Sequence, residues 1–211
     1  MSAPVLVCFA VPQEAKPFRQ LVRGRTDVRV LITGMGAHNA EQPMREALKS
    51  IRPARVFSCG FAGGLDPALK CGAVVFDPHT TPHHLAAKLQ GAGAAPASFV
   101  CSERVVITVA EKSALRASTG ADAVEMESAI IHQICRKAEV ECATVRVISD
   151  SAGENLPLDF NALTTTEQKL SSTRLAIAIL KAPHKIPALM RLGRNSTTGA
   201  QRLAEVLMKI I

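Results

Sequence analysis

The chain lacks tryptophan and tyrosine altogether, and it has only 7 phenylalanines in 211 residues. Proteins that bind single-stranded nucleic acid stack bases on aromatic rings, so this scarcity argues against such a platform. Long apolar runs are absent too, because stretches such as 175–180 fall far short of the roughly 18 residues that a membrane-spanning helix needs. No basic leader or signal-type cleavage pattern precedes the first apolar stretch at 5–10. These absences predict a cytoplasmic protein.

Metal-binding patterns are also missing. The six cysteines form no CxxC pair and no zinc-type spacing with histidine, and we interpret them as buried, reduced thiols. The histidine doublet at 83–84 has only Asp77 and His79 nearby as further ligands. The glycines of Gly34-Met-Gly36 lack the third glycine and the acidic partner of a dinucleotide site. We therefore predict no metal and no organic cofactor.

What is present fits one α/β domain. With 47% apolar and 20% charged residues, the chain is too apolar for disorder. Short apolar runs alternate with helical patterns. The sequence predicts strands at 5–10, 28–33, 55–59, 74–76, 99–101, 104–109 and 142–149, and helices at 13–22, 38–50, 111–118 and 124–139. A flexible turn is expected at 60–64 and a mobile loop at 77–98.

Positive charge is concentrated at the C-terminal end. From residue 169 to 211 there are eight lysines and arginines and a single acid, Glu205, against a net charge of +7 for the whole chain. Prolines at 183 and 187 divide this region into a helix, a turn and a final helix near 199–211. Two interpretations stay open: a solvated basic face of surface helices, or attraction to a polyanion, chiefly anionic lipid and secondarily nucleic acid.

Four charged residues interrupt or end apolar elements, namely Glu14, Glu127, Arg146 and Asp150. Singly, each has an ordinary explanation as a surface residue, an ion-pair partner within a strand or a helix cap. Polar groups at the carboxyl ends of strands, however, gather where open α/β sheets bind ligands. Together these residues indicate two or more carboxylates around one crevice, an arrangement that suits acid/base chemistry.

Five segments resemble a known family. They read Phe9-Ala-Val-Pro-Gln-Glu14, Thr33-Gly-Met-Gly-Ala-His-Asn-Ala40, Ser58-Cys-Gly-Phe-Ala-Gly-Gly-Leu65, Ala123-Val-Glu-Met-Glu-Ser128 and Val145-Arg-Val-Ile-Ser-Asp150. In this order they resemble the nucleoside phosphorylase and nucleosidase superfamily, most of all its methylthioadenosine/S-adenosylhomocysteine nucleosidases. The resemblance covers about residues 5–155. It implies a three-layer αβα sandwich with a central mixed sheet, one domain over 1–211 with a basic helical region at 169–211, and a homo-oligomer.

The same resemblance implies cleavage of the N-glycosidic bond of an adenine nucleoside. Asp150 would act at N7 of the purine, so that the base leaves as a neutral molecule. Glu127 would hold the ribose hydroxyls while the sugar acquires positive charge. Glu14 would orient the attacking water, with Arg146 near the water site. A carboxylate at the sugar and an acid at the base match the charges that develop as the bond breaks.

Further substrate contacts are implied by position. Met126 would pack against the sugar, with Glu125 beside it on the same helical turn. The backbone around Val105 and Val106 would meet the edge of the base. The remaining expected contacts belong to the glycine-rich turn and are Phe61, Ala62 and Gly63.

Because of two departures from the family pattern, the sequence leaves open whether water or phosphate is the nucleophile. Phe61 stands where the nucleosidases commonly have serine. Arg55 and Ser58 resemble the phosphate-binding strand of bacterial purine nucleoside phosphorylases, and an arginine with a hydroxyl suits phosphate geometry. Phosphate is therefore the alternative co-substrate to water. Glu14 favours hydrolysis, because a carboxylate facing bound phosphate would repel it.

A narrower resemblance concerns Phe61-Ala-Gly-Gly-Leu-Asp-Pro-Ala-Leu69, Met126-Glu-Ser128 and Lys181-Ala-Pro-His-Lys-Ile-Pro-Ala-Leu-Met-Arg-Leu192. These segments look like the phosphorylase-like proteins associated with hopanoid biosynthesis. That resemblance implies an adenosylhopane-type lipid nucleoside as substrate and peripheral contact with an anionic membrane. A third alternative is a non-catalytic lipid- or nucleic-acid-binding protein that reuses the fold.

Overall fold

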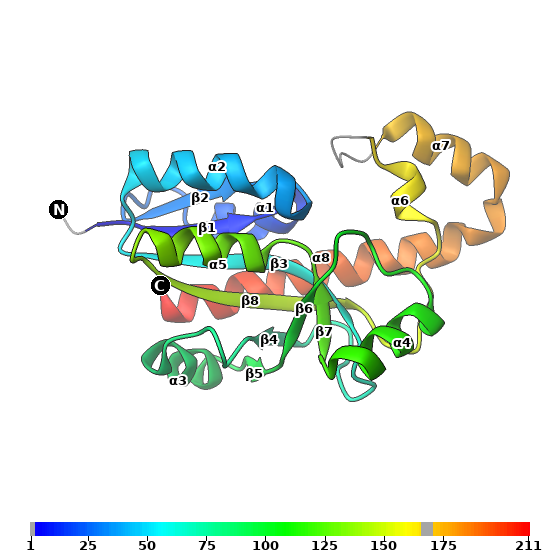
Figure 1. The fold of residues 1–211 in the computed structure, drawn as a ribbon. Coiled ribbons are helices and arrows are strands. Elements are labelled where there is room, and N and C mark those ends of the chain that lie inside the picture. Colours follow the sequence, from blue (N-terminus) through cyan, green and yellow to red (C-terminus); the bar gives the residue numbers. More distant parts are fainter. Residues whose placement is uncertain (1–2, 166–170) are drawn as a thin grey trace.

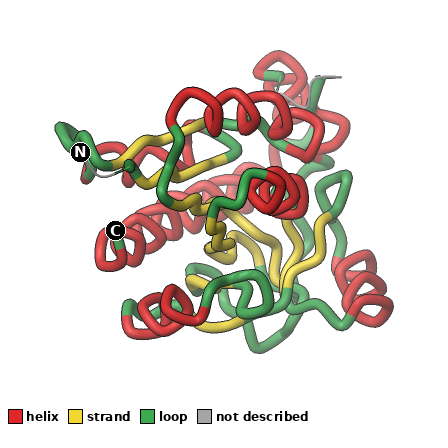
Figure 2. The backbone as a smooth tube through the Cα atoms, turned by 60° about the vertical axis from the view of Figure 1, so that its left-hand side comes forward, coloured by secondary structure: helices red, strands yellow, loops and turns green. Residues whose placement is uncertain are grey.

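The computed structural model describes residues 3–165 and 171–211 and contains a mixed sheet with helices on both faces (Figures 1 and 2). The strands are β1 Val5–Phe9, β2 Val28–Ile32, β3 Arg55–Gly64, β4 Val74–Phe76, β5 Ala95–Pro96, β6 Phe99–Cys101, β7 Ala123–Glu125 and β8 Glu141–Asp150. The helices are α1 Pro12–Leu21, α2 Gly36–Ile51, α3 His83–Gly91, α4 Val109–Thr119, α5 Ser128–Lys137, α6 Phe160–Leu163, α7 Ser172–Lys181, the 3₁₀ turn η1 Pro183–Lys185 and α8 Ile186–Ile210.

The sheet order is β2-β1-β3-β8-β4-β5, with β7 paired to β3 and β6 to β7. Strands β2, β1, β3 and β8 are parallel, whereas β4 runs antiparallel to β8. The registers Val5↔Arg55 and Arg55↔Glu141 align the beginnings of three central strands. Consequently β3 and β8 also end together, with Gly63 opposite Asp150. Their shared carboxyl end is the edge at which sheets of this kind bind ligands.

Alternation along the strands builds two hydrophobic layers. On β1, Leu6 and Cys8 face one side of the sheet and pack with α2 and α5, while Val7 and Phe9 face the other side and pack with α1 and α8. Burying both faces explains why the central strands read as continuous apolar runs rather than alternating ones. The three-layer αβα sandwich predicted from the sequence is confirmed.

Several boundaries predicted from the sequence are wrong. The segment 60–64 is not a turn, because β3 continues to Gly64 with β8 beside it and β7 pairing with its end. The segment 77–98 is not one long loop, since α3 lies within it and buries Leu85 and Leu89. In both places partners distant in sequence supply hydrogen bonds or an apolar surface that local composition does not reveal.

Three more elements differ from expectation. The segment 104–109 is not a strand; it leads into α4, whose start is fixed by a reciprocal capping box between Thr108 and Glu111. The predicted helix over 124–139 is divided into strand β7 and helix α5, which begins only at Ser128. The final helix begins at Ile186 rather than near 199, because Pro187 occupies its first turn, where proline is tolerated.

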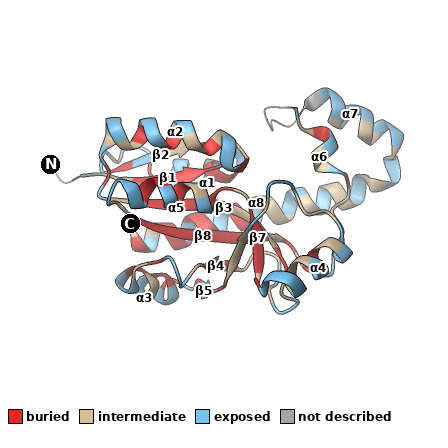
Figure 3. Cartoon of the chain, in the orientation of Figure 1, coloured by how far each residue is buried: buried red, intermediate tan, exposed pale blue. Residues whose placement is uncertain are grey.

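Helix α8 ties the C-terminal region to the sheet. Its second half is buried, with Leu203 and Leu207 in the main core and Gly199 packed so closely that an added Cβ would lie 3.1 Å from Val147. Its first half extends past the sheet, and α6 and α7 lie at that same end of the molecule (Figures 1 and 3). Within residues 3–165 and 171–211, no helix has the length and apolar character to cross a membrane.

All six cysteines are free thiols, as predicted. The prediction that all of them are buried is wrong for Cys71, which is half-buried, and for Cys101, which is exposed. Among the described residues, no group of three or more His, Cys, Asp and Glu side chains is arranged to hold a metal ion.

Candidate active site

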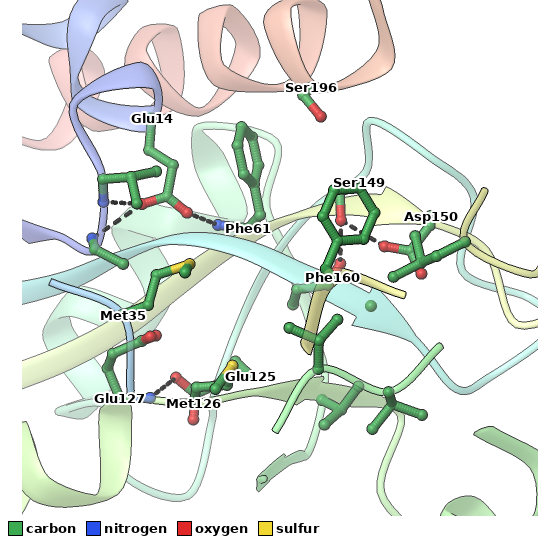
Figure 4. Close-up of a pocket in the computed structure, with 18 of the residues that line it drawn as sticks. Glu14, Met35, Phe61, Glu125, Met126, Glu127, Ser149, Asp150, Phe160 and Ser196 are labelled. Atoms are coloured by element: carbon green, nitrogen blue, oxygen red, sulfur yellow. Dashed lines mark hydrogen bonds between the residues drawn. The ribbon is translucent and has the colours of Figure 1, made fainter. Parts of the chain in front are cut away.

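A cavity of about 260 Å³ lies at the carboxyl ends of β1, β3 and β8 (Figure 4). Its walls contain ten of the residues singled out in the sequence, from five separate segments. They are Glu14, Phe61, Ala62, Gly63, Val105, Val106, Glu125, Met126, Glu127 and Asp150. The prediction that several carboxylates share one crevice therefore matches this geometry.

Glu14 lies in the first turn of α1 and is 5% exposed. Its Oε2 accepts hydrogen bonds from the backbone N–H groups of Ala10 (2.9 Å) and Val11 (3.0 Å), and its Oε1 accepts one from Phe61 N–H (2.8 Å). Burial raises the pKa of this carboxyl, and the three N–H donors oppose that rise. The carboxyl group is thus fixed in orientation at the cavity wall, in an environment suited to accepting a proton.

Gly60 makes room for that carboxyl group. Its φ is +152°, and a Cβ built on it would lie 2.8 Å from Glu14 Oε1. We expect Gly60→Ala to displace Glu14, lowering kcat by about tenfold or more and stability by about 1–3 kcal/mol. Gly93→Ala is the matched control, because Gly93 has φ +100° and no atom within 4 Å of an added Cβ. Steady-state kinetics and thermal unfolding of both variants test this; equal activities would contradict the steric role of Gly60.

Glu125 ends β7 and is buried at 4% exposure. Its Oε2 lies 2.5 Å from Arg146 Nη2 and accepts the backbone N–H of Ser128, while its Oε1 accepts the Ser128 hydroxyl and the Cys101 thiol. Burial works to raise the pKa of Glu125, but the Arg146 charge and the hydrogen bonds hold it below its usual value. Glu125 lies on a strand and not on one helical turn with Met126, so its role here is that of a buried, ionised partner of Arg146.

Glu127 has the opposite character, although it is only two residues away. It occupies the position before α5, and its Oε1 accepts the backbone N–H of Gly36 at 2.7 Å, at the start of α2. Burial and the neighbouring charge of Glu125 raise the pKa of Glu127 to about 7, although Arg146, 3.8 Å away, opposes the rise. One buried carboxylate and one carboxyl that titrates near neutrality therefore stand side by side.

Arg146 lies beneath the cavity rather than in its wall. It is 1% exposed in the middle of β8, where its guanidinium donates to the Ser58 carbonyl (2.6 Å), to Ser58 Oγ (3.1 Å) and to Glu125. Arg146 is not among the residues that line the cavity, and the expectation that it lies near the attacking water stays a prediction. It compensates the charge of the buried glutamates, a role that only the pairing of β3, β7 and β8 brings about.

The two residues proposed to hold phosphate are not brought together at the cavity. Arg55 stands at the beginning of β3, at the opposite end of the strand from Gly63, and lies 3.4 Å from Glu141. Ser58 is buried and engaged by Arg146. The geometry thus corrects the expectation of an Arg55–Ser58 phosphate site.

Asp150 ends β8 and lines the cavity near Ser149 and Phe160 (Figure 4). Its Oδ1 accepts the Ser149 hydroxyl at 2.6 Å, and its Oδ2 lies 2.5 Å from Lys112 Nζ. Lys112 is 1% exposed, the one side chain that α4 buries. Sequence reasoning missed this lysine, because a lysine in a short helix ordinarily faces solvent and nothing nearby in the chain marks it.

The segment after β6 forms the wall expected to meet the base. Val105 N–H donates to Asn161 Oδ1 and Asn161 Nδ2 donates to Val105 C=O, both at 2.9 Å. Val105 and Val106 both line the cavity. Because Asn161 engages both the N–H and the C=O of Val105, contact between this stretch of backbone and the edge of the base stays a prediction. Sequence reasoning also missed the C-terminal part of the wall, which comprises Leu156, Phe160, Leu192 and Ser196.

Comparisons with known proteins agree with this geometry. The family model described as the phosphorylase superfamily matches residues 8–92 and 83–181. A 5'-methylthioadenosine/S-adenosylhomocysteine nucleosidase from Glaesserella parasuis is 29% identical over 185 residues, which cover 72% of this chain and 80% of that enzyme.

Solved structures share the fold at low sequence identity. The nucleosidase of the same name from Helicobacter pylori, solved with butyl-thio-DADMe-Immucillin-A, has a TM-score of 0.76 at 16% identity, over 100% of this chain and 98% of that one. Futalosine hydrolase from the same organism has a TM-score of 0.75 at 17% identity, over 100% and 97%. The family match spans most of the chain, and the fold and the order of its motifs agree with it. The chain belongs to the phosphorylase superfamily.

Proposed function

We propose that the chain hydrolyses the N-glycosidic bond of an adenine nucleoside, with methylthioadenosine and S-adenosylhomocysteine as the first substrates to test. The observation that carries the proposal is that Glu14, Glu127 and Asp150 converge on one cavity from three separate elements. The relative from Glaesserella parasuis, named for these two substrates, supports the choice.

The residues divide the reaction between them. As the bond between C1' of the sugar and N9 of the base breaks, its electron pair goes to the base, which takes a proton at N7 from Asp150. Glu127 accepts hydrogen bonds from the ribose hydroxyls and stabilises the positive sugar. Water then forms the new bond to C1' and gives its proton to Glu14. Water is the only co-reactant, so the mechanism needs no cofactor.

The charges around the cavity favour water over phosphate. Four carboxyl groups line it, those of Glu14, Glu125, Glu127 and Asp150. Among the described lining residues Arg104 is the only lysine or arginine, and its Nη2 is already 2.6 Å from Glu111. A phosphate dianion would meet repulsion here with no fork of free donors to offset it.

Product chromatography tests the proposal. Purified protein is incubated with methylthioadenosine, S-adenosylhomocysteine and adenosine, each with and without phosphate. We expect adenine and the free sugar in the absence of phosphate. Release of adenine only with phosphate, together with a ribose 1-phosphate product, would replace hydrolysis by phosphorolysis. Release of adenine from none of these would overturn the choice of substrates.

A second candidate function is cleavage of a lipid-linked adenine nucleoside that the protein takes from a membrane. The surface next to the cavity favours this candidate. Of six strongly exposed large apolar side chains among the described residues, four lie between 177 and 190. They are Ile177, Leu180, Ile186 and Met190. No described side chain of α7 is buried, and the helix stands away from the sheet (Figure 3). Leu192 and Ser196, which lie on α8 beyond Met190, line the cavity.

The charge of this apolar face favours an anionic bilayer over a second copy of the chain as its partner. Residues 171–204 contain six lysines and arginines and no acid. A second copy of the same face, meeting it across a two-fold axis, would bring like charges together. A basic face with exposed Leu, Ile and Met side chains instead matches the surface of an anionic membrane. A homo-oligomer formed through other surfaces stays compatible with this arrangement and remains an expectation.

Vesicle sedimentation measures this contact. We expect the protein to sediment with phosphatidylglycerol-containing vesicles, not with pure phosphatidylcholine, and to be released by about 0.5 M salt. Ile177→Ser with Leu180→Ser should weaken binding about tenfold or more. Leu21→Ser alters a leucine on α1 that is 51% exposed, against 47% for Ile177 and 80% for Leu180, and it should not weaken binding. No sedimentation with phosphatidylglycerol-containing vesicles, or a dimer that the double variant splits in light scattering, would count against the membrane.

A further inference from the structure

Lys112 is the buried charge that the reaction described above does not use. Its Nζ lies 2.5 Å from Asp150 Oδ2, 2.7 Å from the carbonyl oxygen of Ser151 and 2.9 Å from that of Glu154. These three acceptors satisfy all three N–H bonds of an ammonium group. Lys112 is absent from the cavity wall, so it reaches the substrate only through Asp150.

The surrounding chain fixes this lysine in place. The capping box of Thr108 and Glu111 sets the first turn of α4 one residue before Lys112. The loop that follows β8 is tied to the same turn, because Asn155 Oδ1 accepts Val109 N–H at 2.7 Å and Leu156 N–H donates to Ile107 C=O at 2.8 Å. Both partners of the ion pair are thus held by rigid neighbours.

Stability alone does not account for such a pair. Removing a lysine and an aspartate from water is costly, and well-packed apolar residues of similar volume often serve the fold as well or better. Lys112 engages only Oδ2 of Asp150, whereas Oδ1 accepts the Ser149 hydroxyl, and both Ser149 and Asp150 line the cavity. The arrangement fits a device that presents one oxygen of Asp150 to a ligand in a set orientation.

We propose that Lys112 is a positioning residue for the departure of the base: it orients Asp150 so that Oδ1 serves N7, and its charge stabilises the carboxylate that remains when the proton has passed to the base. This inference rests on the proposed function. For that step Asp150 first takes up a proton from solvent on Oδ1, where the Ser149 hydroxyl can turn to accept it. The N7–H bond then forms as the Asp150 O–H bond breaks, and the ammonium group of Lys112 keeps its protons. Measured from the complex with protonated Asp150, negative charge grows on this carboxyl in the transition state, so an ammonium beside it lowers the barrier of the proton transfer.

The test compares Lys112→Met, Asp150→Asn and the double variant on two substrates. Methylthioadenosine has a leaving base that needs a proton, whereas p-nitrophenyl β-D-ribofuranoside has a leaving group that departs without one. We expect Lys112→Met to lower kcat on methylthioadenosine about 100-fold, with KM nearly unchanged. On the p-nitrophenyl substrate its rate should stay within about threefold of the wild type. In the Asp150→Asn background the same change should have no further effect.

Controls separate the outcomes. Lys88→Met removes an exposed lysine of α3 and should leave both rates unchanged. If Lys112→Met does not fold, as judged by thermal unfolding, Lys112→Gln keeps a donor for the backbone carbonyls and carries the same comparison. Equal losses on both substrates, or losses that multiply in the double variant, would overturn the positioning role. If the wild type releases no adenine at all, the proposed function has failed instead.

Discussion

Asp150→Asn is expected to lower kcat for adenine release by about 10²–10⁴-fold, the range associated with loss of a general acid. Asparagine has nearly the same shape as aspartate, but it keeps only one oxygen that can accept a hydrogen bond, from Lys112 or from Ser149, and it has no acidic proton to give to the base. The loss should therefore appear in kcat rather than in KM. Steady-state kinetics with methylthioadenosine, with adenine measured by chromatography, is the direct measurement.

Asp27→Asn serves as the control for this substitution, because Asp27 pairs with Arg25 on the surface, away from the cavity lining. It should retain wild-type kinetics. The thermal midpoint of Asp150→Asn should also be recorded, since Lys112 loses its carboxylate partner. A folded Asp150→Asn enzyme with full activity would remove Asp150 from the mechanism.

Glu127→Gln is expected to abolish a pH dependence centred near neutrality. The pKa of Glu127 is raised to about 7, chiefly by burial, so the carboxylate that we propose to bind the ribose forms only as pH rises through that value. In the wild type kcat/KM should therefore increase between about pH 6 and pH 8, because this parameter reports groups of the free enzyme. The variant should be about 100-fold slower at pH 8 and lack this limb.

The difference between the two proteins should shrink at about pH 5.5, where wild-type Glu127 is itself uncharged. The neighbours that face Glu127 bear on this profile: Arg146 and ionised Glu125 are common to both proteins, and Glu14 also has a raised pKa. Measuring kcat/KM across this range for both proteins tests the assignment. An acid limb that survives unchanged in Glu127→Gln would assign it to Glu14 instead.

The same carboxyl group has a consequence for stability. Because its pKa is higher in the folded chain than in the unfolded one, the folded state binds more protons between about pH 4.5 and 7. The contribution of Glu127 to folding is thus most favourable at low pH and is lost as pH rises through about 7. Glu127→Gln should accordingly unfold at the same or a higher temperature than the wild type at pH 8, while being far less active. A lower midpoint would show that the charge of Glu127 supports the fold.

Sequence patterns served well where structure is determined locally. Continuous apolar runs separated by helical periodicity identified β1, β2 and β8 nearly to their ends, because a strand buried on both faces must be apolar throughout. They failed at 60–64, 104–109 and 124–139. At 60–64 the glycines belong to a strand and not to a turn, and at 104–109 the chain leads into the capping box of a helix instead of forming a strand. At 124–139 a strand of three residues comes before the helix.

The composition of the cavity could be foreseen in part. Glu14, Glu127 and Asp150 follow or end apolar strands, and parallel strands place such residues at one edge of the sheet. The lining residues Leu156, Phe160, Leu192 and Ser196 could not, nor could Lys112 and Asn161, which contact lining residues from behind the wall. All of them depend on contacts between elements that are far apart in the chain.

By itself, the sequence determined the α/β class, the motif order of the phosphorylase superfamily and the carboxylates available for chemistry. Only the tertiary structure decided the charge environment of each carboxylate. Glu125 and Glu127 differ by two positions, yet one is paired with Arg146 and the other is pushed toward protonation. The physical reason is that burial and charge at a site are set by strands and helices that meet in space, and nothing in the spacing of residues along a chain specifies how close two charges will be.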